Sequence, residues 1–397
     1  MDPHPAPARS GFHRQPGAGP LAARSRLGKP GALPPGPEPV PALRVDVLVI
    51  GAGTAGAVIA RQLHRAGLAT LLVGRPGAGL RPGESLPGAA RPLLRDLGLL
   101  SVLDHSAALP NLGNLVSWDS DTLQPTDFIQ DPHGLGWHLD RPRFDACLLE
   151  AARSDGVLHI EAQVNRVQRL SEGWRVGTQA GDFSAGFVVD ASGRHGVLRR
   201  RLGLARICDT PLVAVYASAR DAHEDHRTVL EATPEGWWYS ACLPGGRRIA
   251  VLHTDAGNAS RLIHTPSLWH QGLAGTRYLQ HWCRASEGWS PLSATGAGGG
   301  ALCTAQGPDW LAVGDAALAF DPLSSQGIFN ALYTALRGAQ AVVAHHRGDQ
   351  LGAQAYSGQL HQVREHYLRR VRYYYQAQTR WPQAHFWRLR RNEALRA

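Results

Sequence analysis

The chain has 397 residues, a formal net charge of +9 and an ordinary content of hydrophobic residues. This length is sufficient for a large buried core and for two domains. No apolar run approaches the roughly 20 residues that a membrane-spanning helix needs. The N-terminus also lacks the apolar core of a signal peptide. We therefore expect a cytoplasmic protein without a membrane span.

The first 42 residues differ in composition from the rest of the chain. They hold eleven of the 27 prolines, so we expect residues 1–42 to form a disordered leader or to reflect a misassigned start codon. Five cysteines occur without any CxxC spacing, which favours buried reduced thiols over disulfides or a metal site. Lys29 is the only lysine, so the other 40 basic residues are arginine. The positive charge favours an acidic partner but identifies none.

The chain opens with the pattern of a βαβ unit. Residues 45–50 form an apolar, β-branched run typical of a buried parallel strand. A helix is predicted over residues 54–66, ending before Gly67, and a second strand over residues 69–73.

Further helices are predicted over residues 87–97, 143–152, 267–284 and 326–345. Strands are predicted within residues 111–140, 157–176, 187–190 and 211–254. Near the C-terminus, apolar residues recur at helical spacing at Leu360, Val363, Tyr367, Val371 and Tyr374. This spacing predicts a helix packed on the body of the protein.

A GxGxxG motif follows the first strand and supplies Gly51, Gly53 and Gly56, with Ala55 between the last two. The first glycine suits a tight turn, the second a close approach of the backbone to a pyrophosphate, and the third close packing of helix and strand. The acid expected at the end of the second strand is absent, because Val73 is followed by Gly74 and Arg75. Either another group holds the ribose, or Arg75 contacts phosphate.

A second segment, WLAVGDAALAFDPLSSQGIFNAL at residues 310–332, predicts which dinucleotide binds. A strand that ends in Gly314-Asp315 before a helix suits the ribityl chain and ring of FAD; the alternative for Asp315 is a simple helix cap. The helix N-terminus would face the flavin pyrimidine. The loop before that helix supplies the further cofactor-binding candidates Pro322, Ser325, Gly327 and Ile328.

Together these segments resemble the FAD-dependent monooxygenase superfamily. The runs GESLPG (residues 83–88) and VGDAALAFDPLSSQG (residues 313–327) are similar to its tryptophan-halogenase-like branch. The resemblance implies an α/β fold in which a p-hydroxybenzoate hydroxylase-like FAD-binding Rossmann domain is interleaved with a β-sheet substrate domain, followed by a C-terminal helical segment. The implied boundaries are 43–110, 141–210 and 296–345 for the FAD-binding domain, 111–140 and 211–295 for the substrate domain, and 346–397 for the C-terminal helix and basic aromatic tail.

The resemblance also implies roles for residues between these segments. Asp190 and Gly193, in the run DASG, are similar to the DxxG element of FAD monooxygenases, although a structural turn would use the same residues. Arg143 matches an arginine that contacts the pyrophosphate in similar flavoproteins; the alternative is an ordinary surface arginine.

Halogenation is disfavoured. Halogenases of this branch carry a lysine that binds the hypohalous acid, whereas this chain has no lysine after Lys29. Their WxWxIP motif would fall at residues 237–242, which read WWYSAC. Among the reactions of this branch, hydroxylation of an aromatic ring is then expected, with O₂ and with electrons from NAD(P)H or a separate flavin reductase.

Two sets of side chains are candidates for this chemistry. Trp237, Trp238 and Tyr239 would form a wall beside the flavin, or serve only as core residues of a strand. Glu84 and His138 are candidate catalytic bases by position alone.

The tail YYYQAQTRWPQAHFWRLRR at residues 373–391 resembles the flavoproteins that mature protein-derived quinone cofactors, although packing alone would explain its aromatic residues. This resemblance implies a protein substrate that presents a tryptophan, with an aromatic small molecule as the other possibility. No nucleic-acid partner is expected. Two alternatives of the same fold remain open, namely an FAD-linked reductase or dehydrogenase and a non-catalytic flavoprotein chaperone.

Overall fold

The protein is described by a computed structural model over residues 43–77, 79–80 and 82–394, with only the backbone described for residues 392–394. The leader expected at residues 1–42 lies outside these residues. The predicted βαβ opening is confirmed by β1 (Arg44–Ile50), α1 (Thr54–Arg65) and β2 (Thr70–Val73). Strand β1 is central and pairs in parallel with β2 on one side. Its apolar residues are buried on both faces, which explains the continuous apolar run.

The sheet around β1 carries the dinucleotide-binding unit. Its order within the described residues is β19-β20-β11-β1-β2-β8, and the antiparallel hairpin β9–β10 joins it at β11. Strand β11 pairs in parallel with β1 and with β20, so all three end at the same edge. The remaining strands of this sheet are β8 (Leu158–Ile160), β9 (Val164–Arg169), β10 (Trp174–Thr178), β11 (Gly181–Asp190), β19 (Gln306–Gly307) and β20 (Trp310–Ala312).

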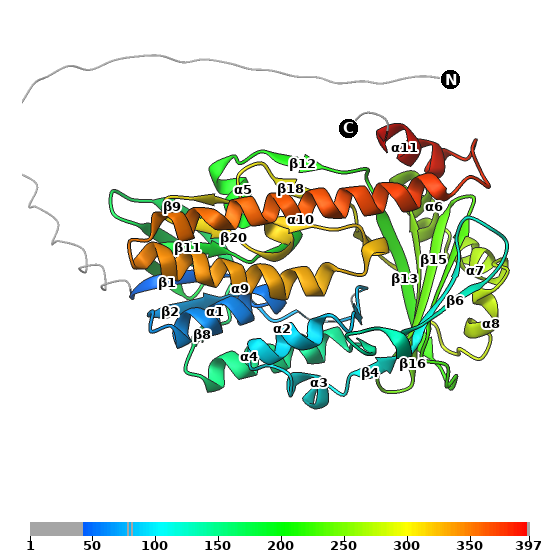
Figure 1. Cartoon of the computed structure of the whole chain (residues 1–397), viewed down its shortest axis with the longest axis horizontal. Coiled ribbons are helices and arrows are strands. Elements are labelled where there is room, and N and C mark those ends of the chain that lie inside the picture. Colours follow the sequence, from blue (N-terminus) through cyan, green and yellow to red (C-terminus); the bar gives the residue numbers. More distant parts are fainter. Residues whose placement is uncertain (1–42, 78, 81, 395–397) are drawn as a thin grey trace, which may run out of the picture. The chain divides into compact units, whose positions relative to one another are not determined.

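A second large sheet forms the other half of the structure. Its order within the described residues is β17-β13-β16-β15-β14-β5-β6, mostly antiparallel. One face packs on helices α6, α7 and α8, where Trp238 and Trp269 are buried together (Figure 1). Its strands are β5 (Gly113–Ser117), β6 (Gln124–Asp127), β13 (Val213–Arg220), β14 (Thr228–Thr233), β15 (Gly236–Leu243), β16 (Arg247–Thr254) and β17 (Ser293–Gly296).

Small sheets and short helices connect the two large sheets. The small sheets, as far as the structure describes them, have the orders β3-β7-β4 and β12-β18-β21. Their strands are β3 (Ser85–Leu86), β4 (Leu109–Asn111), β7 (Gly136–His138), β12 (Arg206–Cys208), β18 (Gly300–Leu302) and β21 (Leu318–Ala319). The helices are α2 (Ala90–Asp96), α3 (Val102–His105), α4 (Arg141–Ser154) and α5 (Val197–Leu202), with 3₁₀ turns η1 (Phe128–Gln130), η2 (Gly193–His195), η3 (Gly314–Ala316) and η4 (Pro322–Ser324).

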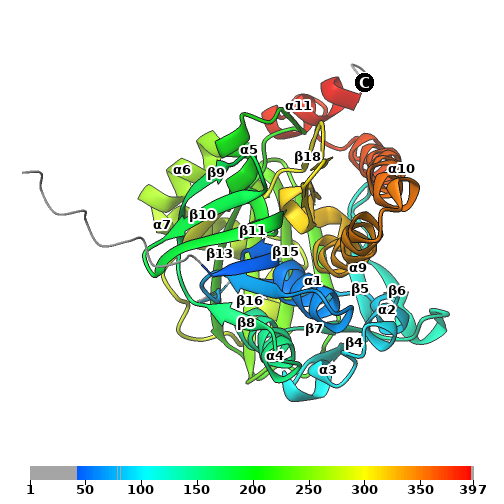
Figure 2. The same ribbon diagram turned by 90° about the vertical axis from the view of Figure 1, so that its left-hand side faces the viewer.

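The C-terminal helices join both sheets. Helices α9 (Gly327–His346) and α10 (Gln350–Ala377) lie side by side along one flank, and α11 (His385–Ala394) follows (Figures 1 and 2). Early in α10, the Tyr356 hydroxyl donates to the Ala312 carbonyl at 2.7 Å. Near its end, Tyr375 is buried and Tyr374 is exposed. The spacing predicted Tyr374 on the packed side of the C-terminal helix, and this prediction was wrong by one residue.

The single helix predicted over residues 267–284 is divided in the structure. It consists of α7 (Pro266–Ala274) and α8 (Leu279–Cys283), preceded by α6 (Ala256–His264). The break has a long-range cause, because the carboxylate of Glu231 on β14 accepts hydrogen bonds from the backbone of Arg277, Tyr278 and Leu279. This carboxylate satisfies the free N–H groups at the start of α8, as a capping side chain does.

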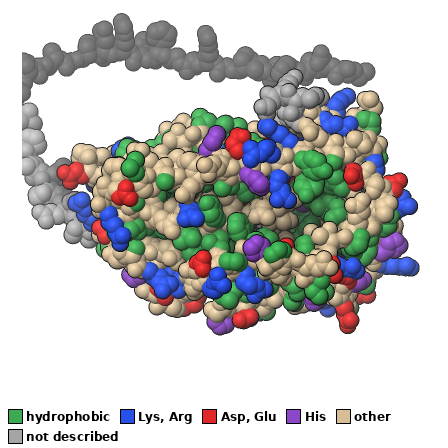
Figure 3. Space-filling view, viewed as in Figure 1, with side chains coloured by type: hydrophobic (Ala, Val, Ile, Leu, Met, Phe, Trp, Pro, Cys, Tyr) green, Lys and Arg blue, Asp and Glu red, His purple; other side chains and the backbone are tan. Residues whose placement is uncertain are grey.

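Three features of the described residues bear on the expected class of protein. None of the helices in the described part of the chain has the length and apolar character needed to cross a bilayer. All five cysteines are free, but Cys208 and Cys303 are exposed, so the expectation of buried thiols fails for these two. Basic side chains are scattered among hydrophobic ones on the face seen in Figure 3.

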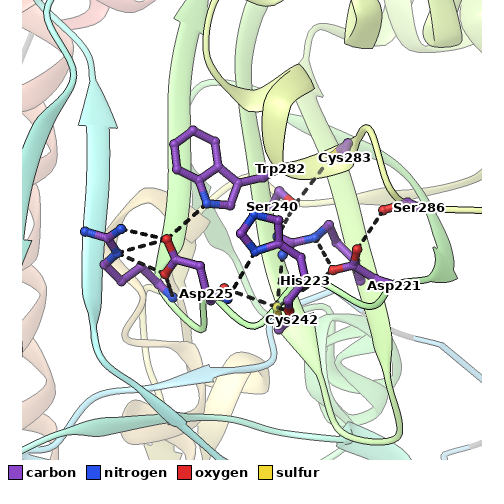
Figure 4. A network of polar contacts seen from close by, with 10 residues as sticks. Asp221, His223, Asp225, Ser240, Cys242, Trp282, Cys283 and Ser286 are labelled. Carbon is purple, nitrogen blue, oxygen red and sulfur yellow. Dashed lines mark hydrogen bonds and ion pairs between the residues drawn. The ribbon is translucent and has the colours of Figure 1, made fainter.

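A buried ion pair stabilises the large sheet on the side that faces α8. Nε of Arg248 lies 2.6 Å from the Asp221 carboxylate, and the two side chains are 0% and 1% exposed. The Arg248 guanidinium also donates to Ser240 and to the sulfur of Cys242. Figure 4 shows its three partners, Asp221, Ser240 and Cys242. Because each of the three guanidinium nitrogens has a partner, the charge is tolerated inside the protein.

We predict that Arg248→Met lowers the free energy of unfolding by about 3–5 kcal/mol, because it leaves the Asp221 charge buried and unpaired. The double variant Arg248→Met/Asp221→Leu should recover much of this loss. Urea unfolding measures both effects, and Arg95→Ala, in an exposed pair with Asp96, is the matched control with no expected change. Equal midpoints for Arg248→Met and Arg95→Ala would contradict the prediction.

Candidate FAD site and aromatic chamber

The GxGxxG loop forms a compact cradle at the carboxyl end of β1. Gly51 has φ +110°, and a Cβ there would lie 2.5 Å from the Ala191 carbonyl oxygen. A Cβ on Gly56 would lie 1.7 Å from the carbonyl oxygen of Gly51, so only glycine allows α1 to start here. Gly53 precedes α1 and has open space where its Cβ would be. The free N–H groups of this helix start therefore face an open cradle suited to a pyrophosphate.

The end of β2 lies beside this cradle. A Cβ on Gly74 would lie 2.5 Å from the Ala52 nitrogen, so the residue that replaces the expected acid must be small. The Gly74 carbonyl lies 2.8 Å from Nε2 of His159, on the neighbouring strand β8. Arg75 is exposed, lines the cavity, and donates to the Gln179 side chain at 3.2 Å.

Arg141, not Arg143, is the arginine of α4 that reaches the cradle. Its guanidinium donates to the Gly83 carbonyl at 2.9 Å and contacts the Asp145 carboxylate at 3.3 Å. Asp145 in turn accepts from the Thr54 hydroxyl in the first turn of α1. Arg143 donates to the His105 carbonyl and does not line the cavity. Two residues along a helix amount to a rotation of about 200°, which places the two arginines on opposite sides.

Asp190 has a local role, and Gly193 reaches the cavity. The Asp190 carboxylate accepts hydrogen bonds from the backbone of Ser192 and Leu198 and is 1% exposed. Burial raises its pKa, which these hydrogen bonds partly offset. Asp190 therefore stabilises the turn after β11, and Gly193 and Arg194 of that turn line the cavity.

The second predicted segment lines the same cavity as the first and lies against it, because a Cβ on Gly314 would be 3.0 Å from the Ala55 side chain. Asp315 lines the cavity, and its carboxylate lies 3.2 Å from Nε of Arg194. The backbone N–H of Gly314, at φ +58°, donates to the Thr334 hydroxyl on α9. The predicted loop and helix-start residues also line the cavity: Ala55, Pro322, Ser325, Gly327 and Ile328. The structure thus brings ten of the thirteen FAD candidates to one cavity, and the three that do not line it are Gly56, Arg143 and Asp190.

This cavity, of about 870 Å³, continues to the large sheet. There it is lined by Tyr216 on β13, Trp237 and Tyr239 on β15, and His253 on β16. We call this end the aromatic chamber. Trp238 does not belong to it, because alternate residues of a strand point to opposite faces. Its ring packs on Trp269 at 5.2 Å between centroids, on the α7 side of the sheet.

His253 is a chamber residue that sequence reasoning missed. Its ring stacks on that of Trp237 with centroids 3.7 Å apart and an interplanar angle of 14°. Burial lowers its pKa to about 3, so the imidazole is neutral at physiological pH. No motif contains His253, and the only signal is its position directly opposite Trp237 in the β15–β16 register.

Glu84 and His138, the candidate bases, are buried beside the chamber and do not line the cavity. Nε2 of His138 lies 3.0 Å from the Thr228 hydroxyl, and burial lowers its pKa to about 3. Glu84 directly precedes β3, next to Gly83 and Ser85, which do line the cavity. Burial raises the pKa of the Glu84 carboxyl, and the neighbouring Tyr239 hydroxyl lowers it.

Comparison with known proteins identifies the family of this chain. Residues 119–397 match the model of the tryptophan halogenase family. The chain belongs to the tryptophan halogenase family. It is 31% identical to the putative FAD-dependent oxidoreductase LodB of Marinomonas mediterranea, over 87% of this chain and 96% of LodB. The predicted resemblance is therefore confirmed, and this family member is an FAD-dependent oxidoreductase.

Solved structures confirm the predicted fold class. This family member superposes on the flavin-dependent halogenase CmlS with a TM-score of 0.79 at 23% identity, covering 89% of this chain and 69% of CmlS. It also matches QhpG, a peptidyl tryptophan dihydroxylase essential for tryptophylquinone cofactor biogenesis. That match has a TM-score of 0.69 at 26% identity and covers 87% of this chain and 78% of QhpG.

The residues present fit FAD. The open helix start at Gly53 suits the pyrophosphate, the Asp315 carboxylate suits a ribityl hydroxyl, and the α9 N-terminus at Gly327 suits the flavin pyrimidine. Bound FAD supplies the redox chemistry of this family member. The residues that line the cavity would hold the cofactor.

We predict that two glycine substitutions separate binding from folding. Gly53→Ala should leave the thermal unfolding midpoint of the apoprotein unchanged, because no protein atom lies within 4 Å of the added methyl group. It should weaken FAD binding by about tenfold (~1.4 kcal/mol), because the methyl group would occupy the space proposed for the pyrophosphate. Gly56→Ala should lower both, because its methyl group collides with the Gly51 carbonyl. Flavin titration and thermal unfolding measure the two effects.

Gly358→Ala, at an exposed and open position of α10, is the control that should leave FAD affinity unchanged. If Gly53→Ala bound FAD as tightly as Gly358→Ala, the pyrophosphate would not lie at this loop.

Proposed function

We propose that this chain hydroxylates an aromatic ring, and that the ring is a tryptophan side chain of a protein that matures into a quinone-cofactor enzyme. The observation that carries the proposal is the continuous cavity that joins the FAD cradle to the aromatic chamber. An indole seated in the chamber would lie along the path to Asp315 and the α9 N-terminus. The QhpG match supports a peptidyl tryptophan as substrate, and the match to LodB is consistent with it.

The chamber walls suit a flat, apolar ring. The Trp237 indole N–H is already used, because it donates to the Tyr375 hydroxyl at 3.2 Å. Trp237 therefore offers only its ring surface, and His253 is stacked beside it. A neutral imidazole provides one hydrogen-bond donor and one acceptor beside the ring surface of Trp237. We propose that His253 orients the substrate ring while Trp237 excludes water from it.

The residues that line the cavity also disfavour halogenation. No lysine occurs between residue 43 and the C-terminus, so the cations of the cavity are arginines. Arg141 and Arg194 are held by the carboxylates of Asp145 and Asp315. A guanidinium stays protonated and has no free lone pair, so it cannot form the covalent bond to a halogen that an amine can form.

The direct test supplies reduced FAD and O₂ to the protein together with a tryptophan-containing precursor subunit of a quinone-cofactor enzyme, in the presence of bromide. The expected product gains oxygen on a tryptophan, and ¹⁸O₂ labels that oxygen. Incorporation of bromine would support the halogenase alternative instead. Anaerobic oxidation of the flavin by an unsaturated substrate would support a reductase, and free tryptophan tests a small-molecule substrate. NAD(P)H with and without a flavin reductase identifies the electron source.

We predict that His253→Phe keeps the stack on Trp237 and full FAD binding but lowers kcat/KM for hydroxylation by about tenfold, the value of one lost hydrogen bond. Because the pKa of His253 is about 3, its loss should leave the shape of the pH profile above pH 5 unchanged. Steady-state kinetics across pH checks both points.

Trp238→Phe is the matched control on the opposite face of β15. It should lower stability, because it removes volume from the core around Trp269, and leave kcat/KM as in the unsubstituted protein. Equal kinetic losses in Trp238→Phe and His253→Phe would mean that the chamber acts only through stability.

A further inference from the structure

A group of buried polar side chains lies where the small sheet β3-β7-β4 meets the large sheet. Glu84 precedes β3, His138 ends β7, Thr228 begins β14, and Tyr239 lies in β15. Glu84 and His138 are 1% and 0% exposed, whereas Tyr239 lines the aromatic chamber. The group therefore extends from the chamber into the interior of the protein.

The polar atoms of this group are not saturated. Both carboxyl oxygens of Glu84 and the hydroxyl of Tyr239 are buried without a hydrogen-bond partner of normal geometry among the described residues. Buried polar groups are almost always paired, so the unpaired atoms of Glu84 and Tyr239 at one place call for an explanation. The fully paired carboxylate of Glu231, which holds three backbone N–H groups, shows what a structural acid looks like in this fold.

The surroundings of Glu84 act on its pKa in opposite directions. Burial raises its pKa, while the Tyr239 hydroxyl, the backbone N–H groups of its loop and the Arg141 guanidinium lower it. The pKa of Tyr239 is raised well above 10 by burial and by the neighbouring Glu84 charge. The Tyr239 hydroxyl thus keeps its proton at neutral pH and can donate it toward Glu84.

His138 is the weaker candidate. Its ring is neutral because burial lowers its pKa to about 3, and its Nε2 is used in the contact with Thr228. Thr228 is also contacted by the Asn111 amide at 3.3 Å. These contacts hold Thr228 next to the Tyr239 hydroxyl, so His138 is a positioning residue.

We propose that Tyr239 and Glu84 form a proton relay, in which Glu84 accepts, through the Tyr239 hydroxyl, the proton that the aromatic ring loses on hydroxylation. This step rests on the proposed function. When bound, reduced FAD would supply two electrons to O₂, so that one oxygen atom enters the ring and the other leaves as water. The ring carbon gives up its proton to the Tyr239 oxygen as the Tyr239 proton passes to the Glu84 carboxylate, and the proton returns to solvent between turnovers.

A titration of the resting FAD-loaded protein tests the pair without any substrate. Infrared difference spectroscopy should show the carbonyl band of a protonated carboxylic acid that persists well above pH 4.5 and is absent in Glu84→Gln. Tyr239→Phe should move this band to still higher pH, because the hydroxyl lowers the pKa of Glu84. If Glu84→Gln removed no such band, or Tyr239→Phe left its pH dependence unchanged, the relay would be overturned.

Stability gives a second measure of the same coupling. Because the folded state raises the pKa of Glu84, it binds this proton more tightly than the unfolded state does. The contribution of Glu84 is therefore fully present below pH 4.5 and is lost as pH rises through the folded pKa. Relative to Glu84→Gln, the unsubstituted protein should lose stability over that range in urea unfolding at several pH values.

Kinetics tests the role in turnover. Glu84→Gln and Tyr239→Phe should each lower kcat for hydroxylation by about 100-fold while FAD binding and flavin reduction persist, and should remove the acid limb of the pH profile. Tyr278→Phe, whose hydroxyl contacts Asp121 far from the chamber, is the control with unchanged kcat. Full activity of Tyr239→Phe with an unchanged pH profile would overturn the relay. If the unsubstituted protein hydroxylated nothing, the proposed function would fail, and the titration alone would decide whether the pair exchanges a proton.

Discussion

The parallel pairing of β1, β11 and β20 is the constraint from which the site follows. Ile50 lies beside Asp190, and Asp190 beside Ala312, so the three strands end level with one another. The loops that leave these ends carry Gly51, Gly193 and Asp315, which are more than 250 residues apart in the chain at the extremes. Close packing of the loops then demands small residues, as the near contact of Gly51 with Ala191 shows. The cradle is therefore a product of sheet register.

The second half of the site depends on the C-terminal helices. Tyr375 on α10 accepts from the Trp237 indole and donates to the Asp321 carboxylate at 2.9 Å. Asp321 stands at the start of the loop that feeds α9, so one tyrosine joins the chamber wall to the FAD loop. Trp387 on α11 is fully buried and contacts the same cluster. The aromatic tail thus has a packing role, and this role is compatible with a family-specific one.

The sequence was sufficient to predict the position of an element wherever the motif is local. The glycine loop, the segment around Asp315 and the βαβ opening all depend on spacing within about 20 residues, and the structure places them as expected. The failures arise where distant residues decide. Glu231 of β14 caps α8 and divides a helix that periodicity alone predicts as continuous. His253 became visible only through its pairing with Trp237, because a strand register cannot be read from one strand.

Errors of one or two residues had larger consequences at the site than in the fold. Arg143 and Arg141 differ by two positions in one helix, yet only Arg141 reaches the cavity. Trp238 and Trp237 are adjacent, yet they face opposite sides of β15. Because of the helical and strand periods, a shift of one or two residues moves a side chain to another face of its element. A candidate site residue therefore has to be assigned to a face as well as to a helix or strand.

The charge pattern of the cavity narrows the chemistry further. Its cations, Arg75, Arg141 and Arg194, are guanidiniums that neither give up nor accept protons at physiological pH. Asp315 is engaged with Arg194, and His253 stays neutral down to about pH 3. In the proposed relay, a proton released from the substrate ring would move to a group whose pKa burial has raised. Among the described groups that reach the chamber, the Tyr239 hydroxyl with Glu84 behind it meets that condition.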